Sequence, residues 1–297
     1  MNIKNVVVVG AGAMGNGIAH VFAAKGFNVI LVDINPTALE QSLVNISKNM
    51  DRQIARGSLS EEGKLNALEK LQTSTDLKNA SSMADLIIEA ATENESLKKK
   101  IFSEMDSAAP SHCILATNTS SISITRIAAA TKRPGKVIGM HFMNPVPVMK
   151  LVEIIEGYGT DGTTTETITN LSLKLEKIPY TVQDYPGFIA NRILMPMINE
   201  AICALHEGVA GVQEIDQIMK LGMGNPMGPL QLADFIGLDV CLSILNVLYA
   251  GFGNPKYFPN PLMQNMVSAG KLGLKSGQGF YVYSPGSKEL VVAPQFK

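Results

Sequence analysis

The chain has 297 residues, of which 46% are hydrophobic and 17% charged, and its formal net charge is −1. This length suits two domains, and so apolar a composition excludes a disordered chain. A near-neutral charge also argues against a general nucleic-acid-binding surface, because such a surface must neutralise phosphates.

The cysteines argue against two further classes of site. Cys113, Cys203 and Cys241 are odd in number, far apart and without a CxxC pair. This pattern favours neither a disulfide framework nor a zinc site, so we expect no metal. Free thiols are typical of a reducing compartment, and we expect a cytoplasmic protein.

No segment predicts a membrane span. The apolar run Val6–Val9 is too short and breaks into glycines. The longer apolar stretch from Pro229 to Phe252 contains Asp234 and Asp239, which a span of about 20 residues rarely tolerates. We expect this stretch to be a buried helix.

The first part of the chain predicts an α/β fold of the Rossmann type. A β-branched run meets a glycine turn, a helical pattern over 13–25 follows, and "NVILVD" forms a second strand, as in a parallel sheet. A pair of helices, about 36–56 and 60–70, is inserted before the sheet resumes. We expect strands at 3–9, 28–33, 84–90, 113–118, 136–142, 151–156 and 179–183, with helices at about 94–107 and 122–130.

The pattern changes at "DYPG", residues 184–187. The segments beyond it read as helices bounded by Gly, Asn and Pro. We therefore predict a Rossmann domain over residues 1–185, with a mostly parallel sheet, and an all-α C-terminal domain over 186–297.

The turn "GAGAMG" is a GxGxxG motif in the right context, because it closes a strand and opens a helix. Gly10 permits the tight turn, Gly12 lets a pyrophosphate approach the backbone, and Gly15 permits close helix–strand packing. Ala13 and Met14 complete this cofactor-binding segment.

Asp33 ends the second strand, where a carboxylate accepts hydrogen bonds from ribose hydroxyls and repels a 2′-phosphate. No arginine follows in "INPTA", so the expected cofactor is NAD rather than NADP. The alternative is that the glycines serve only packing and Asp33 only caps a helix.

The segment "GMHFMNPVPVMKLVEII" pairs a histidine with an acid. His141 ends one predicted strand, and a proline turn brings Glu153 back on the next. A glutamate bonded to one imidazole nitrogen leaves the other as a proton acceptor. The alternative is a core histidine beside an unrelated acid.

Other polar residues are expected at the same edge of the sheet or just after it. Asn118, Ser120 and Ser121 follow the preceding strand in "ATNTSSISI", and Asn191 begins the helical part in "GFIANRIL". Each of them has a plainer alternative role as a turn or cap residue.

Together these motifs resemble one family. "EAATENESLKKKIF", "ATNTSS", "DYPGFIANRIL", "MKLGMGNPMGPLQLADFIGLD" and "GLKSGQGFY", with the glycine turn and the His–Glu segment, are similar to the 3-hydroxyacyl-CoA dehydrogenases, closest to the monofunctional 3-hydroxybutyryl-CoA enzymes. The resemblance covers nearly the whole chain. It implies an NAD-dependent oxidoreductase that interconverts (S)-3-hydroxyacyl-CoA and 3-ketoacyl-CoA in fatty-acid or butanoate metabolism.

The resemblance also implies residue roles. His141 would be the general base and Glu153 its orienting acid, while Ser120 and Asn191 would hold the substrate oxygen. Glu93 and Lys98 would contact the nicotinamide end of the cofactor, and Asn118 would belong to the same loop. The helical domain would close over the acyl group and form a homodimer.

The helix-pair insertion carries a basic stripe. Lys48, Arg52 and Arg56 lie at i, i+4 and i+8, on one helix face, where they would attract the phosphates of coenzyme A. An ordinary solvated face is the alternative.

Two alternatives to a dehydrogenase remain open. One is a crystallin-like relative that binds NAD without turnover, and the other is an NAD-sensing protein without CoA dependence. Acyl chain length, reaction direction and pathway are not determined by these motifs.

Overall fold

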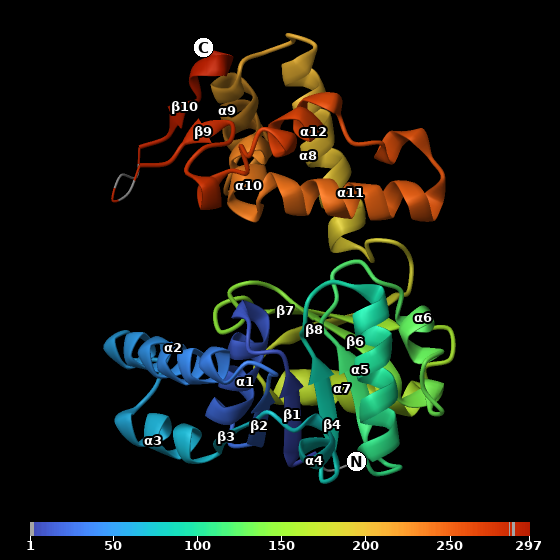
Figure 1. The fold of residues 1–297 in the computed structure, drawn as a ribbon. Coiled ribbons are helices and arrows are strands. Elements are labelled where there is room, and N and C mark those ends of the chain that lie inside the picture. The colour runs from blue at the N-terminus through green and yellow to red at the C-terminus, as the bar shows by residue number, and fades with distance from the viewer. Residues whose placement is uncertain (1–2, 285, 287–288) are drawn as a thin grey trace. The chain divides into compact units, whose positions relative to one another are not determined.

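The computed structural model describes residues 3–284, 286 and 289–297. The chain divides into two compact units, Met1–Tyr185 and Pro186–Lys297. Figure 1 gives the labels used below for both units.

Unit 1 is built on a sheet whose order is β3-β2-β1-β4-β5-β6-β7-β8 in the described residues. All neighbouring strands are parallel except β6 and β7, which are antiparallel. The strands are β1 (Asn5–Val9), β2 (Asn28–Val32), β3 (Leu71–Ser74), β4 (Leu86–Glu89), β5 (Ile114–Thr117), β6 (Val137–Phe142), β7 (Leu151–Glu156) and β8 (Ile178–Gln183).

The helices of unit 1 connect these strands. Helices α2 and α3 form the predicted helix-pair insertion, and both pack on α1 beside the blue strands in Figure 1. Asn35 caps α2 by accepting from the backbone N–H of Thr37 at 3.0 Å. The helices are α1 (Ala13–Ala24), α2 (Pro36–Ala55), α3 (Glu61–Glu69), α4 (Leu77–Ser81), α5 (Glu95–Ala108), α6 (Ile124–Ala128), the 3₁₀ turn η1 (Pro134–Lys136) and α7 (Gly162–Lys174).

Unit 2 is helical, as predicted, and also contains a small antiparallel pair of two-residue strands. Its elements are α8 (Ala190–His206), α9 (Val212–Met223), α10 (Pro229–Ile236), α11 (Leu238–Phe252), η2 (Pro255–Tyr257), α12 (Pro261–Ser268), η3 (Leu274–Ser276), β9 (Tyr281–Val282), β10 (Val291–Val292) and η4 (Pro294–Phe296).

Each unit has its own apolar core. In unit 1 the side chains of Val6, Val8 and Leu31 on the sheet pack with Ile18 and Phe22 of α1. In unit 2 the core gathers side chains from α8 to α12 and from β9. Burying one such aliphatic side chain contributes about 1.5–3 kcal/mol, so the core of unit 1 holds the strand ends of its own sheet in fixed positions.

The prediction of one helix from Pro229 to Phe252 is wrong. The stretch forms α10 and α11, which meet at Gly237 with a bend of 97°. Gly237 has φ of +102°, which an L side chain rarely adopts, so the chain turns there. Among the described residues no single helix is long and apolar enough to cross a membrane, and only this bent pair passes by length and composition.

Candidate functional site

The glycine turn fits a dinucleotide. A Cβ added at Gly10, whose φ is +106°, would lie 2.6 Å from the Ala90 carbonyl oxygen, and one at Gly15 would overlap the Gly10 carbonyl. At Gly12 a Cβ would meet nothing within 4 Å, so the backbone is open on that side. Helix α1 has no side-chain cap at Gly12 and no acidic residue in its first turn. Its N–H groups can therefore receive phosphate oxygens.

Asp33 lies directly after β2, as predicted, and also holds the turn. One carboxylate oxygen accepts from the Ala11 N–H at 2.7 Å, and the other accepts from the Asn35 N–H at 2.9 Å. The hydroxyl of Ser42 on α2 donates to the Ala11 carbonyl at 2.7 Å. Ala11 is thus held at both its N–H and its carbonyl group. The sequence did not predict the role of Ser42 in this turn.

The His–Glu pair forms as predicted. His141 on β6 lies opposite Glu153 on β7 in the antiparallel register. His141 Nδ1 is 2.7 Å from Glu153 Oε2, and both residues are buried, with 6% and 3% of their surface exposed. This bond assigns the Nδ1 proton to the side facing the carboxylate and makes Nε2 the proton acceptor.

Ser120 completes a hydrogen-bonded triad with His141 and Glu153. Its hydroxyl oxygen is 3.2 Å from His141 Nε2, on the side away from Glu153. Asn118 precedes it at the end of β5, and its side-chain oxygen accepts from the Phe142 N–H at 2.8 Å. Asn118 therefore ties the loop after β5 to the strand that carries His141.

Glu93 lies beside this loop. Its Oε1 accepts from the Ser120 N–H at 2.9 Å and from the Thr119 hydroxyl at 2.6 Å. Lys98 lies behind it, fully buried, and its ammonium contacts Glu89 at 2.7 Å and Glu93 at 3.4 Å. The Lys98 side chain has no exposed surface, so Lys98 would influence the cofactor through Glu93. Its assignment to the cofactor stays a prediction.

A groove of about 460 Å³ joins the glycine turn to the helix-pair insertion. Gly12 and Ala13 line it from the turn, Lys48 and Arg52 line it from α2, and residues 144–147 of the proline loop close it. Arg56, at the C-terminal cap of α2, is not among its lining residues. Two of the three residues of the predicted basic stripe thus face the same space as the turn.

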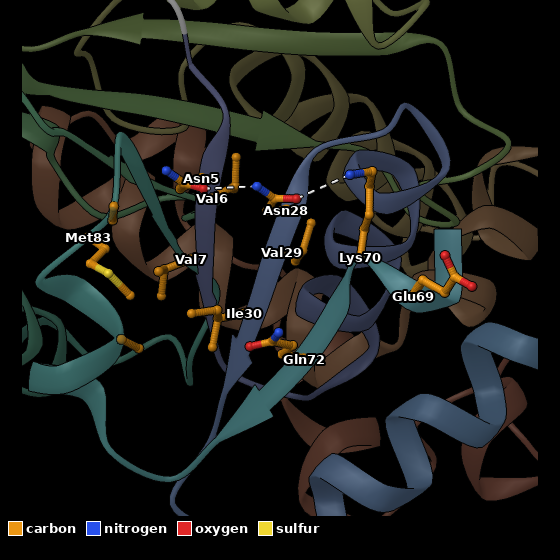
Figure 2. Close-up of a pocket in the computed structure, with 12 residues that line it drawn as sticks. Asn5, Val6, Val7, Asn28, Val29, Ile30, Glu69, Lys70, Gln72 and Met83 are labelled. Atoms are coloured by element: carbon orange, nitrogen blue, oxygen red, sulfur yellow. Dashed lines mark hydrogen bonds between the residues drawn. The ribbon is translucent and has the colours of Figure 1, made fainter. Parts of the chain in front are cut away.

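A second cavity, of about 230 Å³, lies at the opposite end of the strands (Figure 2). It is lined by the first halves of β1 and β2, where Asn28 bonds to Asn5 at 3.1 Å and to Lys70 at 3.3 Å. Its described lining residues include Glu69 and Lys70 but no histidine, cysteine or serine.

Two of the three cysteines are buried and held as neutral thiols. Burial raises the pKa of the Cys113 thiol to about 12, and burial likewise raises that of Cys241 to about 12. Thiols held protonated in this way are poor nucleophiles. Within the described part of the chain no group of three or more His, Cys, Asp or Glu side chains could hold a metal ion.

Asn191 belongs to unit 2. It lies in the first turn of α8 and is 9% exposed. Its participation in the chemistry at His141 stays a prediction.

A dinucleotide turn and a carboxylate-oriented histidine at the carboxyl edge of the same mostly parallel sheet fit a nicotinamide-dependent dehydrogenase. Comparison with known families is more specific. Residues 5–185 match the NAD binding domain of 3-hydroxyacyl-CoA dehydrogenase, and residues 187–283 match the C-terminal domain of the same enzyme. The chain belongs to the 3-hydroxyacyl-CoA dehydrogenase family, which confirms the resemblance and the expected NAD cofactor.

Individual relatives agree. The chain is 51% identical over 283 residues to a probable 3-hydroxybutyryl-CoA dehydrogenase of Bacillus subtilis, with 95% of this chain and 98% of the relative covered. It is 51% identical over 281 residues to a 3-hydroxybutyryl-CoA dehydrogenase of Bradyrhizobium diazoefficiens, covering 95% and 96%. The crystal structure of (S)-3-hydroxybutyryl-CoA dehydrogenase from Ralstonia eutropha superposes with a TM-score of 0.92 at 50% identity, covering 95% and 100%.

Proposed function

We propose that the protein oxidises (S)-3-hydroxybutyryl-CoA to the 3-ketoacyl-CoA with NAD, and catalyses the reverse reduction. The observation that carries this proposal is the chain Ser120–His141–Glu153, with distances of 3.2 and 2.7 Å. It provides a buried base of fixed tautomer at the edge of the sheet where the glycine turn also lies.

The proton transfer follows from this geometry. The 3-hydroxyl of the substrate takes a place beside Ser120, within reach of His141 Nε2, and Nε2 accepts its proton. Glu153, bonded to Nδ1, stabilises the imidazolium that results. In the reverse direction the imidazolium returns the proton to the carbonyl oxygen. Bound NAD supplies the acceptor for the hydride that leaves C3.

Replacing His141 by alanine tests this role. We expect kcat to fall by about 10²–10⁴, the usual contribution of a positioned base, with NAD binding unchanged. Loss of NAD binding is not expected, because the glycine turn follows β1, and β4 and β5 lie between β1 and the strand of His141. Turnover close to that of the unaltered protein would contradict the assignment of His141 as the base.

Different residues would bind the NAD cofactor and the coenzyme A part of the substrate. Gly10, Gly12 and Gly15, with Ala13 and Met14, would hold the pyrophosphate of NAD, and Asp33 its ribose. Lys48 and Arg52 line the groove and have no salt bridge among the described residues, so their charges are available for the phosphates of coenzyme A. Arg56 would act only at longer range, from the end of the helix.

We also propose that the protein is a homodimer through its helical domain. Ile218, Leu221 and Met223 on α9 are 61%, 82% and 65% exposed, and Phe235 on α10 is 56% exposed. A concentration of large apolar side chains on one region is typical of an interface. Sedimentation should give a dimer, and Leu221→Glu should shift it towards monomer.

We place the protein in the cytoplasm, as its free cysteines suggest. The rat relative, 43% identical over 288 residues, is named as a mitochondrial hydroxyacyl-coenzyme A dehydrogenase. Fractionation of the source cells would distinguish the two locations.

A further inference from the structure

A buried ion pair lies directly behind the catalytic loop. Glu89 ends β4, and Lys98 lies in the second turn of α5; neither side chain has any exposed surface. The Lys98 ammonium donates to both oxygens of Glu89, at 2.7 and 2.9 Å. Glu89 also accepts from the Thr117 hydroxyl at 2.7 Å and the Ala91 N–H at 2.6 Å. All four of these contacts of the Glu89 carboxylate are with hydrogen-bond donors.

Glu93 is the exposed member of the same cluster. Its side chain is 39% exposed, and its Oε2 is 3.4 Å from the Lys98 ammonium. Its Oε1 accepts from the loop after β5: from the N–H groups of Ser120 and Ser121 and from the hydroxyls of Thr119 and Ser121. The carboxylate of Glu93 is thus fixed within bonding distance of the residue that touches His141.

The charges of this cluster do not cancel. Two carboxylates and one ammonium leave one net negative charge, and Lys98 is closer to Glu89 than to Glu93. Among the described residues, the exposed cations Lys99 and Arg126 pair with Glu95. The exposed end of the cluster, at Glu93, is therefore where the uncompensated charge lies.

This position matters if the proposed function is correct, since hydride transfer requires the nicotinamide ring to lie against the carbon whose hydroxyl meets His141. Glu93, bonded to the Ser120 N–H, then lies at the nicotinamide end of the cofactor. The nicotinamide ring is positively charged in NAD⁺ and neutral in NADH. A fixed negative charge nearby distinguishes the two.

We propose that Glu89 is a positioning residue that neutralises the charge of Lys98. Glu93 then keeps its negative charge beside the nicotinamide. This charge raises the affinity of the protein for NAD⁺ relative to its affinity for NADH. Without Glu89 the Lys98 ammonium would turn to Glu93 and cancel it. The buried pair would thus set the relative affinity for the two redox forms, without touching either.

Binding measurements on the unligated full chain test this, without reference to turnover. NADH binding is followed by its fluorescence, and NAD⁺ binding by calorimetry. In Glu89→Gln the ratio of the NAD⁺ dissociation constant to that of NADH should rise by about threefold to tenfold, the effect of one unit charge across several ångströms of partly solvated protein. Glu93→Gln, which removes the same charge at the exposed end, should raise the ratio similarly.

A double variant separates charge from structure. Glu89→Gln combined with Lys98→Gln restores one net negative charge, so the ratio should return to within about twofold of the starting value. A purely structural role predicts that the double variant is at least as impaired as the single one. Should Glu89→Gln fail to fold, the comparison of the double variant with Glu93→Gln decides the same point.

Glu104→Gln is the matched control, because it removes one charge near the other end of α5 and should leave the ratio unchanged. An unchanged ratio in Glu89→Gln and Glu93→Gln, or a double variant that stays impaired, would overturn the inference. Failure of the proposed function looks different: the unaltered protein would then bind NAD⁺ and NADH but not reduce a 3-ketoacyl-CoA.

Discussion

Replacing Glu153 by glutamine changes the charge of the His141 partner without changing its size. In the structure His141 Nδ1 donates to Glu153 Oε2 at 2.7 Å, in a buried environment. The imidazolium formed during turnover would lose its anionic acceptor. A glutamine amide could also donate to Nδ1, which would place the ring proton on Nε2 and remove the base.

The size of the effect follows from the hydrogen bond that is lost. A bond to a charged group contributes about 1.5–3 kcal/mol, and about 1.4 kcal/mol corresponds to a factor of ten in rate. We therefore expect kcat for reduction of acetoacetyl-CoA to fall by about tenfold to 150-fold in Glu153→Gln, with little change in KM.

The assay follows NADH consumption at saturating acetoacetyl-CoA, and then at varied substrate concentration to separate kcat from KM. Glu156→Gln is the control, because Glu156 lies on the same strand and bonds Thr165 and Gln183, at 2.7 Å each, rather than His141. A kcat for Glu153→Gln within about twofold of the control would refute the reasoning that Glu153 orients and stabilises the base.

Three further predictions concern the turn, the groove and the buried histidine. Asp33→Ala should improve the efficiency with NADP relative to NAD, and should also weaken NAD binding because the Ala11 N–H loses its acceptor; steady-state kinetics with both cofactors measures this. Arg52→Glu should raise KM for acetoacetyl-CoA several-fold with kcat unchanged, and an unchanged KM would contradict the CoA site. Burial, offset by the Gln53 hydrogen bond and aided by nearby Lys177, lowers the pKa of His20 below its ordinary 6.5. The neutral form of His20 therefore stabilises the fold above pH 6.5, and this contribution is lost as the pH falls through the folded-state pKa. Between pH 7 and 5 the midpoint temperature of unfolding should decline less in His20→Gln than in the unaltered protein.

The parts of the site that the sequence predicted are those set by strand ends. Parallel strands place their carboxyl ends at one edge, so the glycine turn, Asp33, Ser120 and His141 were expected together there, and they lie at the carboxyl ends of β1, β2, β5 and β6. Glu153 was expected opposite His141 because a short proline turn reverses the chain, and the register confirms it.

The Glu89–Lys98 pair could not be predicted in the same way. Glu89 follows an apolar run in "LIIEA", where an acid is most simply read as the solvent-facing end of a strand. Its partner is nine residues further along, on a helix, and the pairing depends on how α5 packs against β4. The assignment of Lys98 to the cofactor came from the family resemblance, and it stays a prediction.

Two of the features that the sequence did not predict have local explanations. Helix α7 has the sequence "GTTTETITNLSLK", whose threonines have low helix propensity; burial of Ile168 and Leu171 in the core overrides this. The break at Gly237 lies within an apolar stretch that periodicity alone reads as continuous. A single glycine is tolerated in many helices, so only the packing reveals the bend.

The measurement that tests the account most directly is NADH oxidation with acetoacetyl-CoA, alongside a long-chain 3-ketoacyl-CoA and free acetoacetate. We expect fast turnover with acetoacetyl-CoA and none with free acetoacetate, because Lys48 and Arg52 in the groove are proposed to bind the coenzyme A handle. The rate with the long-chain thioester then reports the acyl chain-length preference. Binding of NADH without turnover of any of the three would contradict this expectation, and would favour a non-catalytic, crystallin-like member of the family.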